Sequence, residues 1–282
     1  MKIISLIFSL LITVNAFSSW SSKCTDYDSP IDWSYCLHTN DTGNSDQLLY
    51  HFHGKGGSEM TWAEKDFFAE DVRKAWDKNK VNPPKVVSIS LGTVWVLAKK
   101  NGSPYSGLFE LMAGKIIPLI EKTERLAPSK RLLVGNSMGG LNASAMLLNL
   151  PRLFSKVALV CPAISPLTPE SSSADVDKYI LDTGASRDRA ELLVQLTKLF
   201  TPTLSDWKTN SPLVQGPKLL TKNSSELYIS CGDKDEYGFY NYAKEFYNIS
   251  VKRGVKGSWH PIAGGLHCAV NTESLAKFLI VK

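Results

Sequence analysis

The pentapeptide Gly135–Gly139, with the sequence GNSMG, constrains the fold of this chain more than any other stretch. The apolar run at 131–134 before it has the pattern of a short buried strand, and 141–148 after it has that of a helix. The glycines on either side of Ser137 allow a sharp turn in which Cβ atoms would clash. A serine at such a strand–turn–helix junction exposes its hydroxyl at the edge of a sheet, so we expect Ser137 to be a nucleophile.

Strands and helices alternate along most of the chain. Apolar segments predict strands at 33–38, 48–52, 85–91, 131–134, 156–161 and 226–231. Helical spacing of apolar residues predicts helices over 60–78, 108–125, 141–148, 187–200 and 271–281, with a kink in the second at Pro118. This alternation predicts an α/β fold whose central sheet is mostly parallel and has helices on both faces.

The segment 165–224 interrupts this alternation, between the strand that ends near Cys161 and the strand that starts near Glu226. It is too long for a simple connection. We expect a cap-like insertion over the carboxyl ends of the strands, where such sheets bind ligands. An elaborated surface crossover is the alternative.

Residues 1–16 have the pattern of a secretory signal peptide. Lys2 precedes an apolar run, 3–14, that is too short to span a bilayer, and Val14 and Ala16 suit the positions before a signal-peptidase site. We expect cleavage after Ala16, one domain at 17–282, no integral membrane segment in the mature chain, and a secreted or periplasmic location.

Charge and composition exclude some classes of function. The formal net charge is +5, and the lysines and arginines are scattered along the chain, so we expect no nucleic-acid partner. Hydrophobic residues make up 43% of the chain and charged residues 21%, which is ordinary for a globular domain with one large core.

The chain has 5 cysteines, and an exported protein permits disulfides between them. Cys24 and Cys36 lie close together in a polar segment with little core of its own, and we expect them to form a bridge. Each of the others suits a buried free thiol. A Cys231–Cys268 bridge is the alternative, and it would leave Cys161 unpaired.

A nucleophilic serine needs a base within hydrogen-bond reach, and the base needs an orienting carboxylate. A predicted strand ends at Gly232, and Asp233, Asp235 and Glu236 follow it in a loop. We expect Asp235 to be the acid, because it lies three residues past the glycine at the strand end, the usual separation between strand end and acid in such folds. Asp233 is better suited to forming the turn.

Of the 5 histidines, His260 and His267 are the ones that follow this acid. His267 comes after two glycines and just before the last predicted helix, where a loop can carry an imidazole to the serine. His260 lies in a strand-like segment before Pro261. We therefore expect His267 to be the base, since the order serine, acid, histidine is then complete.

Two backbone N–H groups are needed to stabilise the oxyanion that forms when a serine attacks a carbonyl group. One is expected from Met138, the residue after the nucleophile. The other is expected from the glycine-rich loop 53–57, with the sequence HGKGG. Lys55 N–H is the first choice, with either neighbouring glycine as the alternative, and His53 is expected to brace this loop.

His51 and His53 are alternate residues of one strand and could together bind a metal. The sequence offers no third ligand at a suitable spacing. We expect neither a metal nor another cofactor.

These motifs together resemble the α/β-hydrolase superfamily. The shared residues are HGxGG at 53–57, GxSMGG at 135–140, GxxD at 232–235 and GxH at 265–267. The serine-methionine-glycine-glycine turn is similar to that of the putative esterase group, which includes esterase D-like and feruloyl esterase-like enzymes. The resemblance covers 47–282.

The resemblance implies an α/β-hydrolase fold and a secreted serine carboxylesterase. Ser137, His267 and Asp235 would form the triad, with an acyl-enzyme intermediate and a small-molecule or glycan-linked ester as substrate. Acyl transfer or peptide hydrolysis on the same triad is the first alternative. A non-catalytic binding module on a hydrolase fold is the second.

Overall fold

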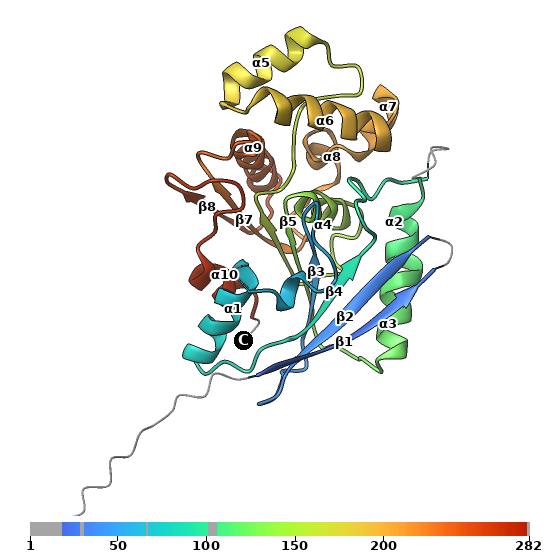
Figure 1. Cartoon of the computed structure of the whole chain (residues 1–282), viewed down its shortest axis with the longest axis vertical. Helices are drawn as coiled ribbons and strands as arrows, with labels where there is room; N and C mark the ends of the chain where they lie inside the picture. The colour runs from blue at the N-terminus through green and yellow to red at the C-terminus, as the bar shows by residue number, and fades with distance from the viewer. Residues whose placement is uncertain (1–18, 29–30, 66, 101–105, 281–282) are drawn as a thin grey trace, which may run out of the picture.

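The computed structural model describes residues 19–28, 31–65, 67–100 and 106–280, and one eight-stranded sheet forms its centre (Figure 1). The strands are β1 (Trp20–Tyr27), β2 (Trp33–Asn40), β3 (Leu48–Phe52), β4 (Lys85–Ser90), β5 (Arg131–Asn136), β6 (Lys156–Val160), β7 (Glu226–Gly232) and β8 (Gly257–Ile262). They lie in the order β1-β2-β4-β3-β5-β6-β7-β8. The pairs β1–β2 and β2–β4 are antiparallel and the others parallel, which confirms the expected mostly parallel sheet.

Helices cover this sheet on both faces. They are α1 (Phe68–Lys78), α2 (Leu108–Leu111), α3 (Ile117–Thr123), α4 (Met138–Asn149), α5 (Ser173–Thr183), α6 (Arg187–Phe200), α7 (Leu204–Asn210), α8 (Pro212–Leu219), α9 (Phe239–Lys252) and α10 (Thr272–Phe278). Helices α1 and α10 lie together, and Trp76 Nε1–H donates to Ala276 O at 2.9 Å between them. No helix in the described part of the chain is both long and apolar enough to cross a membrane.

The elements differ from their predicted bounds where local chemistry overrides periodicity. The helix expected over 60–78 is a 3₁₀ turn at Thr61–Ala63 followed by α1, because Phe67 is extended and begins the helix anew. The kink expected in 108–125 is a π-helical turn at Met112–Ile116. Pro118 lies just after it, in the first turn of α3, where its missing N–H is not needed.

The N-terminal strand β1 was not predicted, because it is polar and mostly exposed and so lacks the apolar alternation of a half-buried strand. Its position at the edge of the sheet explains that composition. The predicted signal peptide, 1–16 with cleavage after Ala16, lies outside the described residues.

The segment 165–224 holds α5 to α8, of which α6 alone was predicted. Helix α5 begins with a capping box in which Ser172 and Asp175 bond to each other's backbone, so the serine-rich stretch 171–173 leads into a helix. Helix α8 packs against α4 and α9, while α5 and α6 form a layer beyond them (Figure 1). That this layer acts as a cap over a substrate stays a prediction.

The disulfides confirm one expectation and correct another. Cys24 and Cys36 are bridged, at paired positions of β1 and β2. The free thiol expected at each of the other three cysteines is present at Cys231, which is buried, and was wrong for Cys161 and Cys268, which are joined to each other. The alternative Cys231–Cys268 bridge was therefore wrong as well. Cys231 lies inside β7 with its sulfur beside Asp235, whereas Cys161 directly follows β6.

Candidate active site

Ser137 lies at a sharp turn between β5 and α4. Its backbone is in a strained conformation, with φ 53° and ψ −118°. A Cβ atom on Gly135 would lie 2.2 Å from Gly139 O, and one on Gly139 would lie 2.0 Å from Phe52 O. Because these are contacts with backbone atoms, glycine is required at both positions, and the expected strand–turn–helix junction is present.

The structure brings the three predicted catalytic side chains together. His267 Nε2 lies 2.9 Å from Ser137 Oγ, and His267 Nδ1 lies 2.8 Å from Asp235 Oδ2. The carboxylate can only accept, so Nδ1 carries the proton and Nε2 is free to accept from the serine hydroxyl. Tyr237 N–H donates to the other oxygen of Asp235 at 2.9 Å, and this carboxylate is fully buried.

The alternative base, His260, is placed elsewhere. It lies within β8, stacks on Tyr228 at 4.1 Å between ring centroids, and contacts Ser258 Oγ through Nε2 at 2.9 Å. The histidine that reaches the serine is therefore the one carried by the loop after β8.

All three candidate carboxylates contact that loop, each in a different way. Asp233 Oδ1 accepts from Gly264 N–H at 2.8 Å, which fits its expected role in the turn. Glu236 Oε2 accepts from the backbone N–H of His267 at 3.0 Å. Sequence reasoning weighed Glu236 as an acid and missed this role, because a backbone contact between distant segments leaves no local signal.

A buried thiol lies against the acid. Cys231 Sγ donates to Asp235 Oδ2 at 3.6 Å, to the same oxygen that His267 contacts. Burial raises the pKa of the Cys231 thiol, and the charge of Asp235 raises it further. The thiol therefore stays protonated and supports the negative charge on the carboxylate.

The glycine-rich loop runs beside the serine. A Cβ atom on Gly54 would lie 3.4 Å from Ser137 Cβ, while Lys55 is exposed. Met138 is the first residue of α4, so its N–H belongs to the positive end of the helix dipole. The assignment of Met138 and Lys55 as oxyanion donors stays a prediction.

His51 and His53 have protein partners for both of their ring nitrogens. His53 Nδ1–H donates to Gly54 O at 2.8 Å, so its ring braces the loop as expected, and its Nε2 lies 2.9 Å from Ser90 Oγ. His51 contacts Ser88 and Asn136 through its two ring nitrogens. Burial lowers the pKa of both histidines, that of His51 to about 3.

One group of potential metal ligands lies close together in the described residues: Cys161, His267 and Cys268, with ligand atoms within 4.8 Å of one another. The two sulfurs are joined in a disulfide, and the nitrogens of His267 face Asp235 and Ser137. This group is therefore not available for metal binding while the disulfide is intact.

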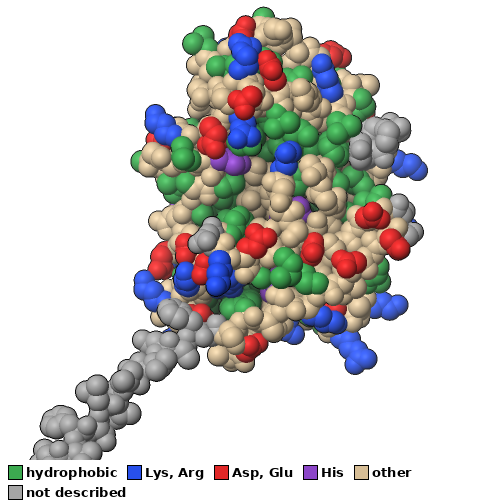
Figure 2. Space-filling view, viewed as in Figure 1, with side chains coloured by type: hydrophobic (Ala, Val, Ile, Leu, Met, Phe, Trp, Pro, Cys, Tyr) green, Lys and Arg blue, Asp and Glu red, His purple; other side chains and the backbone are tan. Residues whose placement is uncertain are grey.

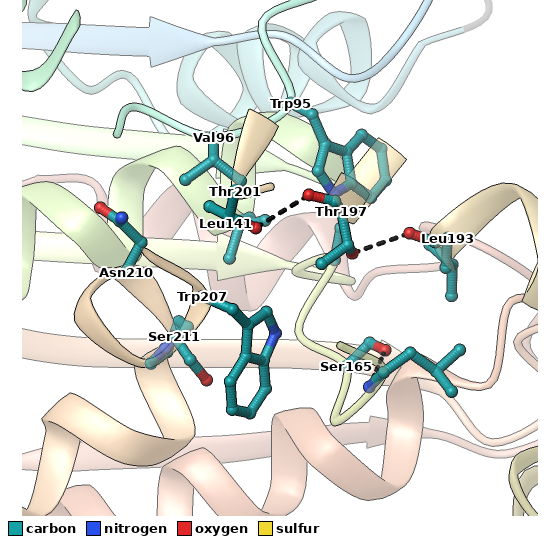
Figure 3. Close-up of a pocket in the computed structure, with 13 residues that line it drawn as sticks. Trp95, Val96, Leu141, Ser165, Leu193, Thr197, Thr201, Trp207, Asn210 and Ser211 are labelled. Carbon is teal, nitrogen blue, oxygen red and sulfur yellow. Dashed lines mark hydrogen bonds between the residues drawn. The ribbon is translucent and has the colours of Figure 1, made fainter. Parts of the chain in front are cut away.

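A cavity of about 40 Å³ lies between α4, the loops after β4 and β6, and the inserted helices (Figure 3). Trp95 from the loop after β4, Leu193 from α6 and Trp207 from α7 project toward it. Among the other lining hydroxyls, those of Thr197 and Thr201 donate to helix carbonyls, and Ser165 Oγ accepts from Leu167 N–H. The buried hydroxyl of Ser211 has no hydrogen-bond partner in the described part of the chain, so it is a polar group available to a ligand or water.

This cavity begins one helical turn from the serine. Leu141 and Ala163 line it, and the N–H groups of both donate to Ser137 O, at 3.0 and 2.9 Å. In the space-filling view, hydrophobic side chains gather below the upper helical layer, where a histidine also reaches the surface (Figure 2). The part of the cavity lining nearest to the Ser137 backbone is thus apolar.

The sequence of this chain matches one family of known proteins. Residues 42–268 match the sequence model of the family described as putative esterase. A search of curated proteins found no match.

Solved structures with the same fold include several esterases. A ferulic acid esterase is 18% identical, with 92% of this chain and 95% of that chain covered and a TM-score of 0.58. An S-formylglutathione hydrolase from Agrobacterium tumefaciens is 13% identical, with 94% and 93% covered and a TM-score of 0.63. A fungal esterase from Rhizomucor miehei is 14% identical, with 93% and 84% covered and a TM-score of 0.67. At these identities the likeness shows the fold.

The glycine contacts at the turn give a test of stability. We expect Gly139→Ala to lower the free energy of unfolding by about 3 kcal/mol or more, because the added Cβ would overlap the Phe52 carbonyl. Gly114→Ala is the matched control, since a Cβ there meets nothing within 4 Å, and it should stay within about 1 kcal/mol of the wild type. Urea unfolding followed by tryptophan fluorescence measures both. Equal stability of the two variants would contradict the expected constraint.

Proposed function

This chain belongs to the putative esterase family, and we propose that it is a serine carboxylesterase. The observation that carries the proposal is the continuous contact from Asp235 through His267 to Ser137, at 2.8 and 2.9 Å. A neutral imidazole between a buried carboxylate and a serine hydroxyl is what proton transfer in ester hydrolysis requires.

In the proposed reaction, Ser137 Oγ attacks the ester carbonyl while His267 Nε2 takes the hydroxyl proton. The imidazolium that forms is stabilised by Asp235, which keeps the Nδ1 proton between them. The oxyanion is held by the N–H groups of Met138 and Lys55. His267 then protonates the leaving alcohol, and water hydrolyses the acyl-enzyme with His267 again acting as base.

We also propose that the chain is exported. The pattern of residues 1–16 and the disulfides Cys24–Cys36 and Cys161–Cys268 support this, because disulfides persist in oxidising compartments. The mature chain would then act outside the cytoplasm, on esters that are secreted or surface-bound.

The cavity beneath the inserted helices is proposed to receive the acyl chain. Its position one helical turn from Ser137 and its apolar walls support this, and its volume of about 40 Å³ favours a short chain. Since one structural neighbour is a ferulic acid esterase, an aromatic acyl ester belongs in the substrate panel.

Removal of the nucleophile tests the central proposal. We expect Ser137→Ala to lower kcat/KM for p-nitrophenyl acetate on the order of 10⁵-fold, because no other group can form the acyl-enzyme. A fluorophosphonate probe should label the wild type at Ser137 and leave the variant unlabelled. Circular dichroism checks that the variant is folded. Retained turnover in a folded variant would remove Ser137 from the mechanism.

Neutralising the acid tests the assignment of Asp235. We expect Asp235→Asn to lower kcat about 10³–10⁴-fold, because the amide no longer stabilises the imidazolium. Asp233→Asn is the matched control, since that side chain contacts Gly264 N–H and not His267, and it should lose less than about tenfold. Steady-state kinetics on one ester decides between them, and a larger loss at 233 would reverse the assignment.

Two leucines on α6 test the acyl pocket. Leu193 is 1% exposed and lines the cavity, whereas Leu199 is 51% exposed. We expect Leu193→Ala to raise the ratio of kcat/KM for p-nitrophenyl hexanoate over acetate about tenfold, because the enlarged cavity buries further methylene groups. Leu199→Ala should leave the ratio unchanged. A ratio unchanged by Leu193→Ala would place the acyl group elsewhere.

A further inference from the structure

We propose that the Cys161–Cys268 disulfide positions the catalytic base, and that its reduction switches the esterase off. This inference rests on the proposed function. The disulfide would fix the backbone next to His267 to the strand end that holds Ser137. The imidazole then stays within hydrogen-bond reach of the serine.

One end of the disulfide, Cys161, belongs to the segment that is hydrogen-bonded to the backbone of Ser137. Ser137 N–H donates to Val160 O at 2.9 Å, and Ala163 N–H donates to Ser137 O at 2.9 Å. Cys161 lies between these two residues, is fully buried, and donates its own N–H to Ser230 O. It is therefore a rigid anchor whose position is fixed relative to the serine.

The other end directly follows the base. Cys268 is the next residue after His267 and has a left-handed backbone, with φ 60°, as Cys161 has with φ 42°. Residues other than glycine rarely adopt this conformation, and it persists where the surroundings impose it. A covalent link between the two cysteines is such a constraint.

The loop before His267 is also held by hydrogen bonds. Lys234 N–H donates to Gly265 O at 2.9 Å, and Glu236 accepts from His267 N–H at 3.0 Å. Between His267 and α10, the hydroxyl of Ser230 in β7 donates to Ala269 O at 3.4 Å. For this part of the described chain, the covalent Cys161–Cys268 bond is thus a stronger link to the sheet than this long hydrogen bond. Breaking it would free the backbone on the C-terminal side of His267.

The end of the bond nearer to solvent is the loop end, because Cys268 is half-buried and Leu266 close by is 64% exposed, while Cys161 is fully buried. Reduction is therefore expected to begin at Cys268. One thiolate of a dithiol would attack Cys268 Sγ and release the Cys161 thiolate, which takes up a proton. The second thiol then displaces Cys268 from the mixed disulfide. The products are two cysteine thiols and the oxidised dithiol, so two electrons and two protons pass to the protein.

The direction of the switch follows from the compartments. A chain in a reducing cytosol would carry free thiols at 161 and 268 and a loosely held base. Disulfide formation after export would complete the active site. The esterase would then act where it is oxidised and stay weak before export.

The Cys24–Cys36 disulfide offers a matched control. It joins neighbouring strands, β1 and β2, that already pair from Trp20 to Tyr27, and β1 lies at the edge of the sheet. Neither cysteine contacts the triad; both sulfurs lie near Met60. Loss of this bridge should leave catalysis unchanged.

The test compares two double variants with the wild type. We expect Cys161→Ala/Cys268→Ala to lower kcat about 10–100-fold with KM changed less than about twofold, because displacement of the base by about 1 Å has that effect. Cys24→Ala/Cys36→Ala should keep wild-type kcat. Dithiothreitol should lower kcat of the wild type and of Cys24→Ala/Cys36→Ala, and should leave kcat of Cys161→Ala/Cys268→Ala unchanged. Oxidised glutathione should restore the lost kcat. Mass spectrometry after iodoacetamide counts the thiols formed.

A second readout does not depend on ester hydrolysis. Hydrogen exchange at 263–270 should rise when the wild type is reduced and in Cys161→Ala/Cys268→Ala, and not in Cys24→Ala/Cys36→Ala. Unchanged exchange there, or wild-type kcat with both thiols at 161 and 268 free, would overturn the inference. Absence of Ser137-dependent turnover in the oxidised enzyme would instead overturn the proposed function, and the exchange data would still decide whether the disulfide holds the loop.

Discussion

The direct contact of backbone with backbone at the start of α4 is the constraint on which the site depends. Gly135 and Gly139 meet without side chains, and Gly139 also meets the Phe52 carbonyl, so α4 lies against β5 and the end of β3. Ser137 is consequently held in a strained turn that only a rigid sheet can maintain. The glycine-rich loop that continues β3 is brought beside the serine by the same packing. Nucleophile and expected oxyanion loop are therefore placed by one contact.

A second contact of the same kind places the base. A Cβ atom on Gly232 would lie 2.1 Å from Gly265 O, so the loop after β8 crosses directly over the end of β7. Asp235 and Glu236 follow Gly232 and hold His267, one by its ring and the other by its backbone. The positions of the acid and the base thus depend on the close approach of two loops. The Asp235 and Glu236 side chains then fix the orientation of the imidazole.

The activity of such a site depends on how rigidly distant segments are joined. Ser137 is anchored to the end of β6 by hydrogen bonds, and the proposed role of the Cys161–Cys268 disulfide extends that anchor to His267. The inserted helices contribute the walls of the cavity beside the serine. Specificity and redox response would then arise from elements outside the triad, while the proposed chemistry would reside in Ser137, His267 and Asp235.

The sequence by itself determined the α/β class, the strand–turn–helix at Ser137 and the order of the catalytic candidates, because each is encoded in local spacing and in glycines next to polar residues. The structure decided what local spacing cannot encode. Which cysteine pairs with Cys268, and that Glu236 holds the backbone of His267, depend on segments far apart in the chain. The helices α5, α7 and α8 of 165–224 were missed because they are short or begin in a serine-rich stretch, and each depends on tertiary packing: α8 on α4 and α9, α7 on α8, and α5 on α6 and α9.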